Sequence, residues 1–134
     1  MKKMIGLCLT LFLFTGLYSQ VTLNFCASVE SNGYCNLTNT KFIASPDSTH
    51  GRIFMEVHGI DRPIGASNIL FKIYRVGKDG SEKFETMLQQ TIQPDWYFAW
   101  MPFNFESPAK YNVKIYNEKD EVIVAKSFEL IAFK

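Results

Sequence analysis

The chain has 134 residues, of which 47 % are hydrophobic, and it carries 14 Lys and Arg against 13 Asp and Glu. That length suits a single domain with a core of its own. The near-neutral charge without a basic cluster argues against nucleic acid or an anionic membrane surface as the main partner.

The N-terminal segment predicts export. Two lysines precede an apolar run from Met4 to Phe14, and a polar stretch that ends in Ser19 follows. The run is shorter than the roughly 20 apolar residues of a membrane span, and this order of features is typical of a secretory signal peptide. We predict a cleaved signal peptide over residues 1–19 and one domain over residues 20–134. The processed protein is expected to be soluble, secreted or periplasmic, without stable insertion in a membrane.

Removal of the signal peptide leaves two cysteines, Cys26 and Cys35. In an oxidising compartment an even pair predicts a disulfide. Closing that loop would stabilise the fold by roughly 2.7 kcal/mol on the chain-entropy model. Two buried free thiols are the alternative. Two of the 14 basic residues also leave, so 12 remain against 13 acidic residues and the net charge becomes −1.

A competing turn signal lies between the two cysteines. Asn32-Gly33 is typical of a two-residue hairpin turn, but such a turn would place Cys26 about 13 Å along the strand from the residue opposite Cys35. A disulfide joins Cα atoms within about 7 Å. We therefore keep the bridge and predict a wider loop over Glu30–Tyr34.

Alternation of apolar and polar residues recurs along the chain and predicts strands. The apolar faces are Val21, Leu23, Phe25 and Ala27; Ile53, Met55 and Val57; Ile69, Phe71 and Ile73; Phe84, Thr86, Leu88 and Ile92; and Tyr111, Val113 and Ile115. Turn residues between them predict loops or hairpin tips at Ser45–Ser48, Gly59–Gly65, Gly77–Gly80 and Asn117–Asp120. A helix over Glu82–Gln93 is the only competing interpretation. Seven or eight short strands predict an all-β, antiparallel two-sheet β-sandwich.

The segment from Phe105 to Ile115 resembles the late strand of immunoglobulin-like sandwich domains. In these domains a Pro-x-x-Tyr-x-Val pattern begins a strand, and the hydroxyl of the Tyr often bonds back to the chain; Tyr111 matches this structural corner. Phe25-Cys26 with Cys35, Ile73-Tyr74-Arg75 and Asp95-Trp96 are similar to small uncharacterised secreted proteins of Gram-negative bacteria. The resemblance implies an immunoglobulin-like sandwich and no particular activity.

The densest group of aromatic residues lies between Asp95 and Phe105. As a strand it would place Trp96, Phe98 and Trp100 on one face and Tyr97, Ala99 and Met101 on the other. One interpretation is a core strand covered on both faces. The other is a surface that presents aromatic side chains to a sugar, a peptide or an apolar partner, with Trp96, Tyr97 and Trp100 as the candidate ligand-binding residues.

Candidate catalytic and metal-binding groups are sparse. Glu56, His58 and Asp61 could begin a metal site, but the repeated Cys and His spacings of such sites are missing, so we predict no metal and no cofactor. The sequence motifs of serine hydrolases, zinc proteases and phosphate-binding loops are absent, so we predict no catalytic residues.

These observations favour an exported, non-catalytic binding module whose partner is a protein, a peptide or a glycan. A structural or accessory subunit that pairs through an edge strand is one alternative. A small hydrolase is the other, and it would need carboxylates clustered with His50 or His58 in a cleft.

Overall fold

The computed structural model describes residues 21–29, 35–44 and 51–132. The predicted signal peptide, the predicted loop at Ser45–Ser48 and His50 lie outside these residues. The described strands are β1 (Val21–Val29), β2 (Cys35–Thr38), β3 (Lys41–Ile43), β4 (Gly51–Gly59), β5 (Asn68–Val76), β6 (Glu82–Thr91), β7 (Phe98–Phe105), β8 (Ala109–Tyr116) and β9 (Val122–Ile131).

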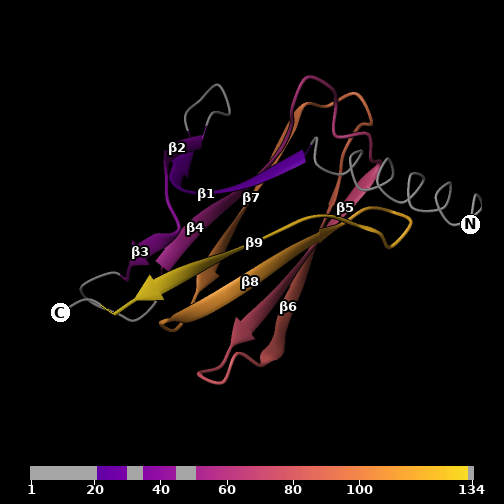
Figure 1. Ribbon diagram of the computed structural model, residues 1–134. Coiled ribbons are helices and arrows are strands. Elements are labelled where there is room, and N and C mark those ends of the chain that lie inside the picture. Colours follow the sequence, from indigo (N-terminus) through magenta and orange to yellow (C-terminus); the bar gives the residue numbers. More distant parts are fainter. Residues whose placement is uncertain (1–20, 30–34, 45–50, 133–134) are drawn as a thin grey trace, which may run out of the picture.

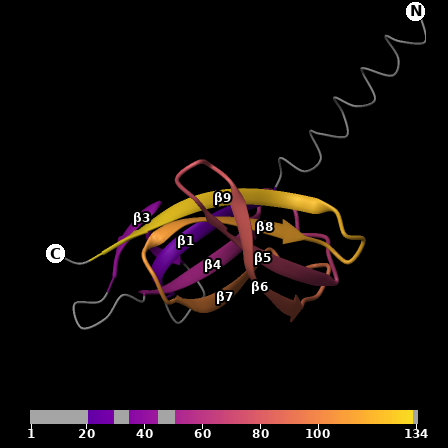
Figure 2. The same cartoon turned by 90° about the horizontal axis from the view of Figure 1, so that it is seen from below.

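The strands form two stacked sheets, as the sequence predicts (Figures 1 and 2). One sheet has the order β2-β1-β4-β7, and the other has the order β3-β9-β8-β5-β6. The all-β sandwich is confirmed, but two details differ from the prediction. The described strands number nine, more than the seven or eight predicted. The sequence does not reveal β2 and β3, because strands of four and three residues are too short for a recognisable alternation. The pairing is also not wholly antiparallel, since β3 runs parallel to β9.

Strand β1 continues into β2 through five residues. The register places Val29 opposite Cys35, and the loop predicted over residues 30–34 lies outside the described residues. Cys26 is fully buried and lies opposite Thr38. Cys26 lies three residues, about 10 Å, along the strand from Val29, the residue opposite Cys35, so the register does not support the Cys26–Cys35 bridge. The side chain of Cys35 lies outside what the structure describes, and the bridge stays a prediction.

The core lies between the sheets and is built mainly from the alternating residues that the sequence predicts, although Ala27, predicted to face the core, is exposed. Ile53, Met55 and Val57 are buried on β4, and the apolar faces of β5 and β8 are buried opposite them. A cluster of aromatic rings fills one end of this core. Phe128 lies at its centre, with ring centroids 4.7 Å from Phe25, 4.8 Å from Phe105, 5.5 Å from Tyr111 and 5.9 Å from Phe42.

The predicted face of β6 is partly wrong. Leu88 packs against the core and Ile92 is buried, but Phe84 is 55 % exposed. The register shifts at this point, since Ile73 pairs with Thr86 whereas Tyr74 pairs with Phe84. Glu85 is therefore an extra, bulged residue. An extra residue reverses the side-chain alternation, so Phe84 points away from the core and packs against the ring of Tyr74.

Tyr111 forms the predicted structural corner. Its ring is buried at the start of β8, and its hydroxyl donates a 2.6 Å hydrogen bond to the backbone carbonyl of Ser107. The bond closes the turn that leads from β7 into β8 and satisfies a polar group at the end of the core. The resemblance to immunoglobulin-like domains thus holds at the residue that carries it.

The predicted hairpin tips are also confirmed. Gly80 has a φ of 85° and Asp120 a φ of 63°, values that glycine, asparagine and aspartate tolerate best. No helix among residues 21–29, 35–44 and 51–132 is long and apolar enough to cross a membrane.

Candidate functional site

Four aromatic side chains near the start of β7 are exposed within five consecutive residues. The exposed fractions are 42 % for Trp96, 51 % for Tyr97, 38 % for Phe98 and 37 % for Trp100. We call these four residues the aromatic surface. The interpretation of this segment as a core strand covered on both faces is wrong, because Phe98 and Trp100 are exposed while Ala99 and Phe105 of the same strand are buried.

Backbone hydrogen bonds fix the start of this segment. The amide of Trp96 donates to the carbonyl of Gln93 at 3.0 Å and closes the turn around Pro94. The amide of Gly59 donates to the carbonyl of Tyr97 at 2.7 Å, and the amide of Ile64 donates to the carbonyl of Trp96 at 2.8 Å. The turn after β6 and the loop after β4 therefore hold each other in place.

The two faces of β7 differ sharply. Ala99 and Phe105 are buried in the core, while Phe98 and Trp100 lie on the outer face of the sheet. On that face Trp100 packs against Phe54 with ring centroids 5.6 Å apart. Tyr97 does not share the buried face of Ala99, because it precedes the strand. The outer aromatics are thus supported from one side and open to solvent on the other.

A groove of about 600 Å³ follows this segment. Its lining is formed by Gln90 of β6 and by the seven consecutive residues from Trp96 to Pro102. The side-chain oxygen Oε1 of Gln90 is buried without a hydrogen-bond partner. The walls of the groove are mainly apolar and aromatic, a composition typical of binding sites.

Polar groups adjoin the aromatic surface on the same sheet face. Glu56 lies opposite Trp100 on one side and opposite Asn24 on the other. It is only 5 % exposed, and its Oε1 accepts a 3.3 Å hydrogen bond from Asn24 Nδ2 and lies 3.9 Å from His58 Nδ1. Asp61 does not complete a metal-binding group with this pair, since the described residues contain no cluster of three His, Cys, Asp or Glu side chains.

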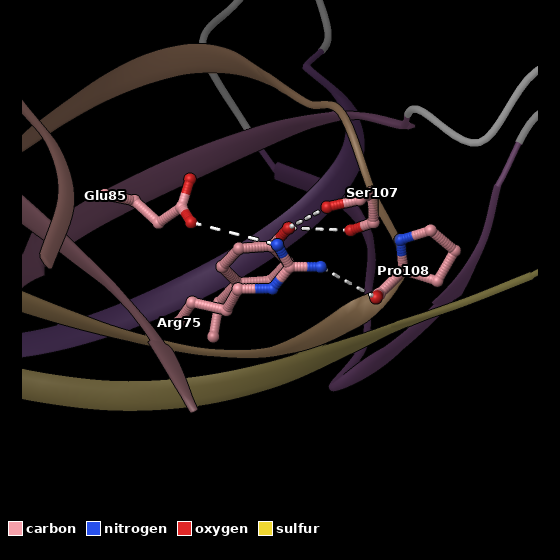
Figure 3. A network of polar contacts seen from close by, with 5 residues as sticks. Arg75, Glu85, Ser107 and Pro108 are labelled. Atoms are coloured by element: carbon pink, nitrogen blue, oxygen red, sulfur yellow. Dashed lines mark hydrogen bonds and ion pairs between the residues drawn. The ribbon is translucent and has the colours of Figure 1, made fainter. Parts of the chain in front are cut away.

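A second cleft, of about 790 Å³, opens between the sheets near β6 and β7. The Arg75 guanidinium lies within it, 4.0 Å from Glu85 Oε1, and donates a 3.5 Å hydrogen bond to the Pro108 carbonyl (Figure 3). The hydroxyl of Tyr111 reaches Ser107 beside it. This arrangement joins the bulge of β6 to the corner before β8. Among the described residues His58 does not line this cleft, and His50, the other histidine of the hydrolase alternative, lies outside the described residues.

The outer face of the other sheet carries a different chemistry. Lys114 Nζ lies 4.7 Å from the ring centroid of Tyr74 and 3.0 Å from Glu82 Oε2. The hydrogen bond from this ammonium holds the pKa of the Glu82 carboxyl below its ordinary value, because it favours the ionised form. Lys72 lies 4.1 Å from the ring centroid of Tyr116. Lysine side chains therefore lie over the rings of Tyr74 and Tyr116 on this face.

Sequence reasoning identified Trp96, Tyr97 and Trp100 as candidates, and the structure brings all three together. It missed Phe98 as an exposed residue and Gln90 as part of the groove. One signal could have found the exposure, because a proline inside a strand, here Pro102, is typical of an edge strand. No local signal marks Gln90, which reaches the groove only through the packing of the two sheets.

One comparison with a solved structure supports the class of fold. The chain is similar to an immunoglobulin-like protein from Pseudomonas aeruginosa, with 14 % identity, a TM-score of 0.52, and coverage of 81 % of this chain and 91 % of that one. The soluble domain of PmoD from Methylocystis has 15 % identity, a TM-score of 0.43, and coverage of 84 % and 90 %. A comparison with protein-family models gives no match, and neither does one with curated protein sequences.

These observations define an immunoglobulin-like β-sandwich of two sheets. At such low identity the likeness concerns the fold alone, and one fold carries many functions. What the protein does must therefore be argued from the aromatic surface and its surroundings.

Proposed function

We propose that the protein is an exported, non-catalytic binding module and that the aromatic surface is its binding site. The observation that carries the proposal is the exposure of Trp96, Tyr97, Phe98 and Trp100 beside one groove. Large aromatic side chains are costly to leave in water, and contiguous exposed apolar surface usually marks a site of interaction. Trp and Tyr also contribute most to binding energy at interfaces.

Binding is tested with two probes, a phage-displayed library of random linear peptides and a printed glycan array. We expect a ligand from one of them. Against that ligand, Tyr97→Ala and Trp100→Ala should each weaken binding by about tenfold or more, as loss of a central interface aromatic does. The matched control is Phe84→Ala, which removes a ring of β6 that is 55 % exposed. Unchanged affinity in Trp100→Ala, or an equal loss in Phe84→Ala, would contradict the proposal.

The export part of the proposal rests on the N-terminal pattern and on the cysteine pair. We expect the protein secreted by its producing cell to begin at Gln20 and to weigh less than the reduced chain by two hydrogen atoms, because Cys26 and Cys35 are oxidised. An intact-mass measurement before and after reduction checks both points. A retained N-terminal segment would contradict the signal peptide, and a mass unchanged by reduction would contradict the bridge.

A further inference from the structure

One edge of β7 has no strand beside it. The strand pairs with β4, and it has no second neighbour among the described residues. Residues along an antiparallel strand alternate between those that bond to the partner strand and those that direct both N–H and C=O away from it. The register and one hydrogen bond decide which residues of β7 belong to each set.

The amide of Gly59 donates to the carbonyl of Tyr97, so this pair is hydrogen-bonded. The register continues without a shift from His58 opposite Phe98 to Gly51 opposite Phe105. Tyr97, Ala99 and Met101 therefore bond toward β4. Phe98, Trp100 and Pro102 direct their backbone groups toward the free edge. Pro102 agrees with this assignment, because it has no N–H and cannot stand at a position that must donate to β4.

The free edge thus offers a short, defined ladder. Phe98 and Trp100 each present one donor and one acceptor, and their repeat of two residues, about 6.8 Å, matches the spacing of an extended backbone. Pro102 has no N–H and interrupts the row of donors, which Asn104 continues at the next position directed toward the free edge. The same stretch, from Trp96 to Pro102, lines the groove together with Gln90 of β6. An extended segment placed there would direct alternate side chains into the groove and outward beside Trp100.

We propose that the partner is an extended polypeptide segment that adds a strand to β7 between Phe98 and Pro102. Its residues at alternate positions are apolar. This inference rests on the proposed function and on the free backbone groups of β7. A saccharide would stack on the indole of Trp100 and its hydroxyl groups can bond to the edge, but only an extended polypeptide carries backbone donors and acceptors that repeat at this spacing. The edge therefore favours a peptide over a glycan.

A pair of variants at one position tests the pairing. Trp100→Ala removes the indole and keeps the amide N–H, whereas Trp100→Pro removes both. The intrasheet hydrogen bonds stay intact in each, because the amide of Trp100 points away from β4. Against a linear peptide selected from the phage library, we expect Trp100→Pro to bind about tenfold more weakly than Trp100→Ala, the loss of one hydrogen bond. Equal affinities of the two variants would overturn the proposal.

A measurement on the unaltered protein guards against misfolding of Trp100→Pro. Hydrogen exchange at the amides of Phe98 and Trp100 should slow when the peptide binds, whereas Ala99, which already bonds to β4, should change little. Unchanged exchange at Phe98 and Trp100 would overturn the proposal.

The proposed function can fail separately. If the ligand is a glycan and Trp100→Ala no longer binds it, the peptide pairing is overturned, but the proposal of a binding module is supported. A ligand that binds Trp100→Ala as tightly as the unaltered protein would overturn both.

Discussion

Replacing Phe128 by alanine is expected to lower the free energy of unfolding by about 3–5 kcal/mol. Phe128 is 2 % exposed and contacts four other aromatic rings, which come from β1, β3, β7 and β8. Its removal leaves a cavity where both sheets meet, and the rigid neighbouring rings cannot collapse into it. For a domain of this size the melting temperature should fall by roughly 10–25 °C.

Urea denaturation and thermal melting check this expectation. The matched control is Phe84→Ala, since Phe84 is 55 % exposed and packs mainly on Tyr74. We expect this second variant to lose less than about 1 kcal/mol. Similar losses in the two variants would mean that the aromatic cluster around Phe128 is not the centre of the core.

The part of the fold that sequence predicts best is the part with one continuously buried face. On β4, Ile53, Met55 and Val57 alternate with residues that point outward, and all three are buried. Strands β5 and β8 follow the same rule. A slip by one residue would turn such a face to solvent, so burial fixes both the strand and its register.

Bulges explain where the alternation fails. On β6 the extra residue Glu85 turns Phe84 outward. On β9 the register shifts where Ile115 pairs with Val124 and Tyr116 pairs with Val122, so Ile123 is out of phase with the buried residues that follow it. A pattern of period two cannot reveal a change of phase. For that reason β9 carries no clear run in the sequence although Phe128 and Leu130 belong to the core.

The aromatic segment shows a different limit of sequence reasoning. The composition around Trp100 identified the segment, but both faces of the run are apolar, and periodicity alone cannot say which one is buried. The register between β4 and β7 decides this, since Ala99 lies opposite the core residue Val57. The paired residues lie 40 to 54 positions apart in the chain.

Gly59→Ala is expected to lower the free energy of unfolding by about 1–3 kcal/mol, the usual effect of forcing an added group into packed structure. A Cβ atom at this position would overlap the carbonyl oxygen of Arg62 and lie 3.0 Å from the carbonyl carbon of Pro63. These neighbours are backbone atoms, so no side-chain rotation relieves the contact. Urea denaturation measures the loss.

The matched control lies at the other end of the same strand. A Cβ atom at Gly51 would lie 2.9 Å from Leu130 Cδ1, the end of a side chain that can rotate, so Gly51→Ala should cost less. Gly59→Ala should also disturb the binding site, because the amide of Gly59 holds the carbonyl of Tyr97. The chain has only two tryptophans, both in the aromatic surface, so a shift in their fluorescence emission in Gly59→Ala but not in Gly51→Ala would report that displacement. Equal stability and unchanged emission in the two variants would show that the loop after β4 yields without moving the aromatic surface.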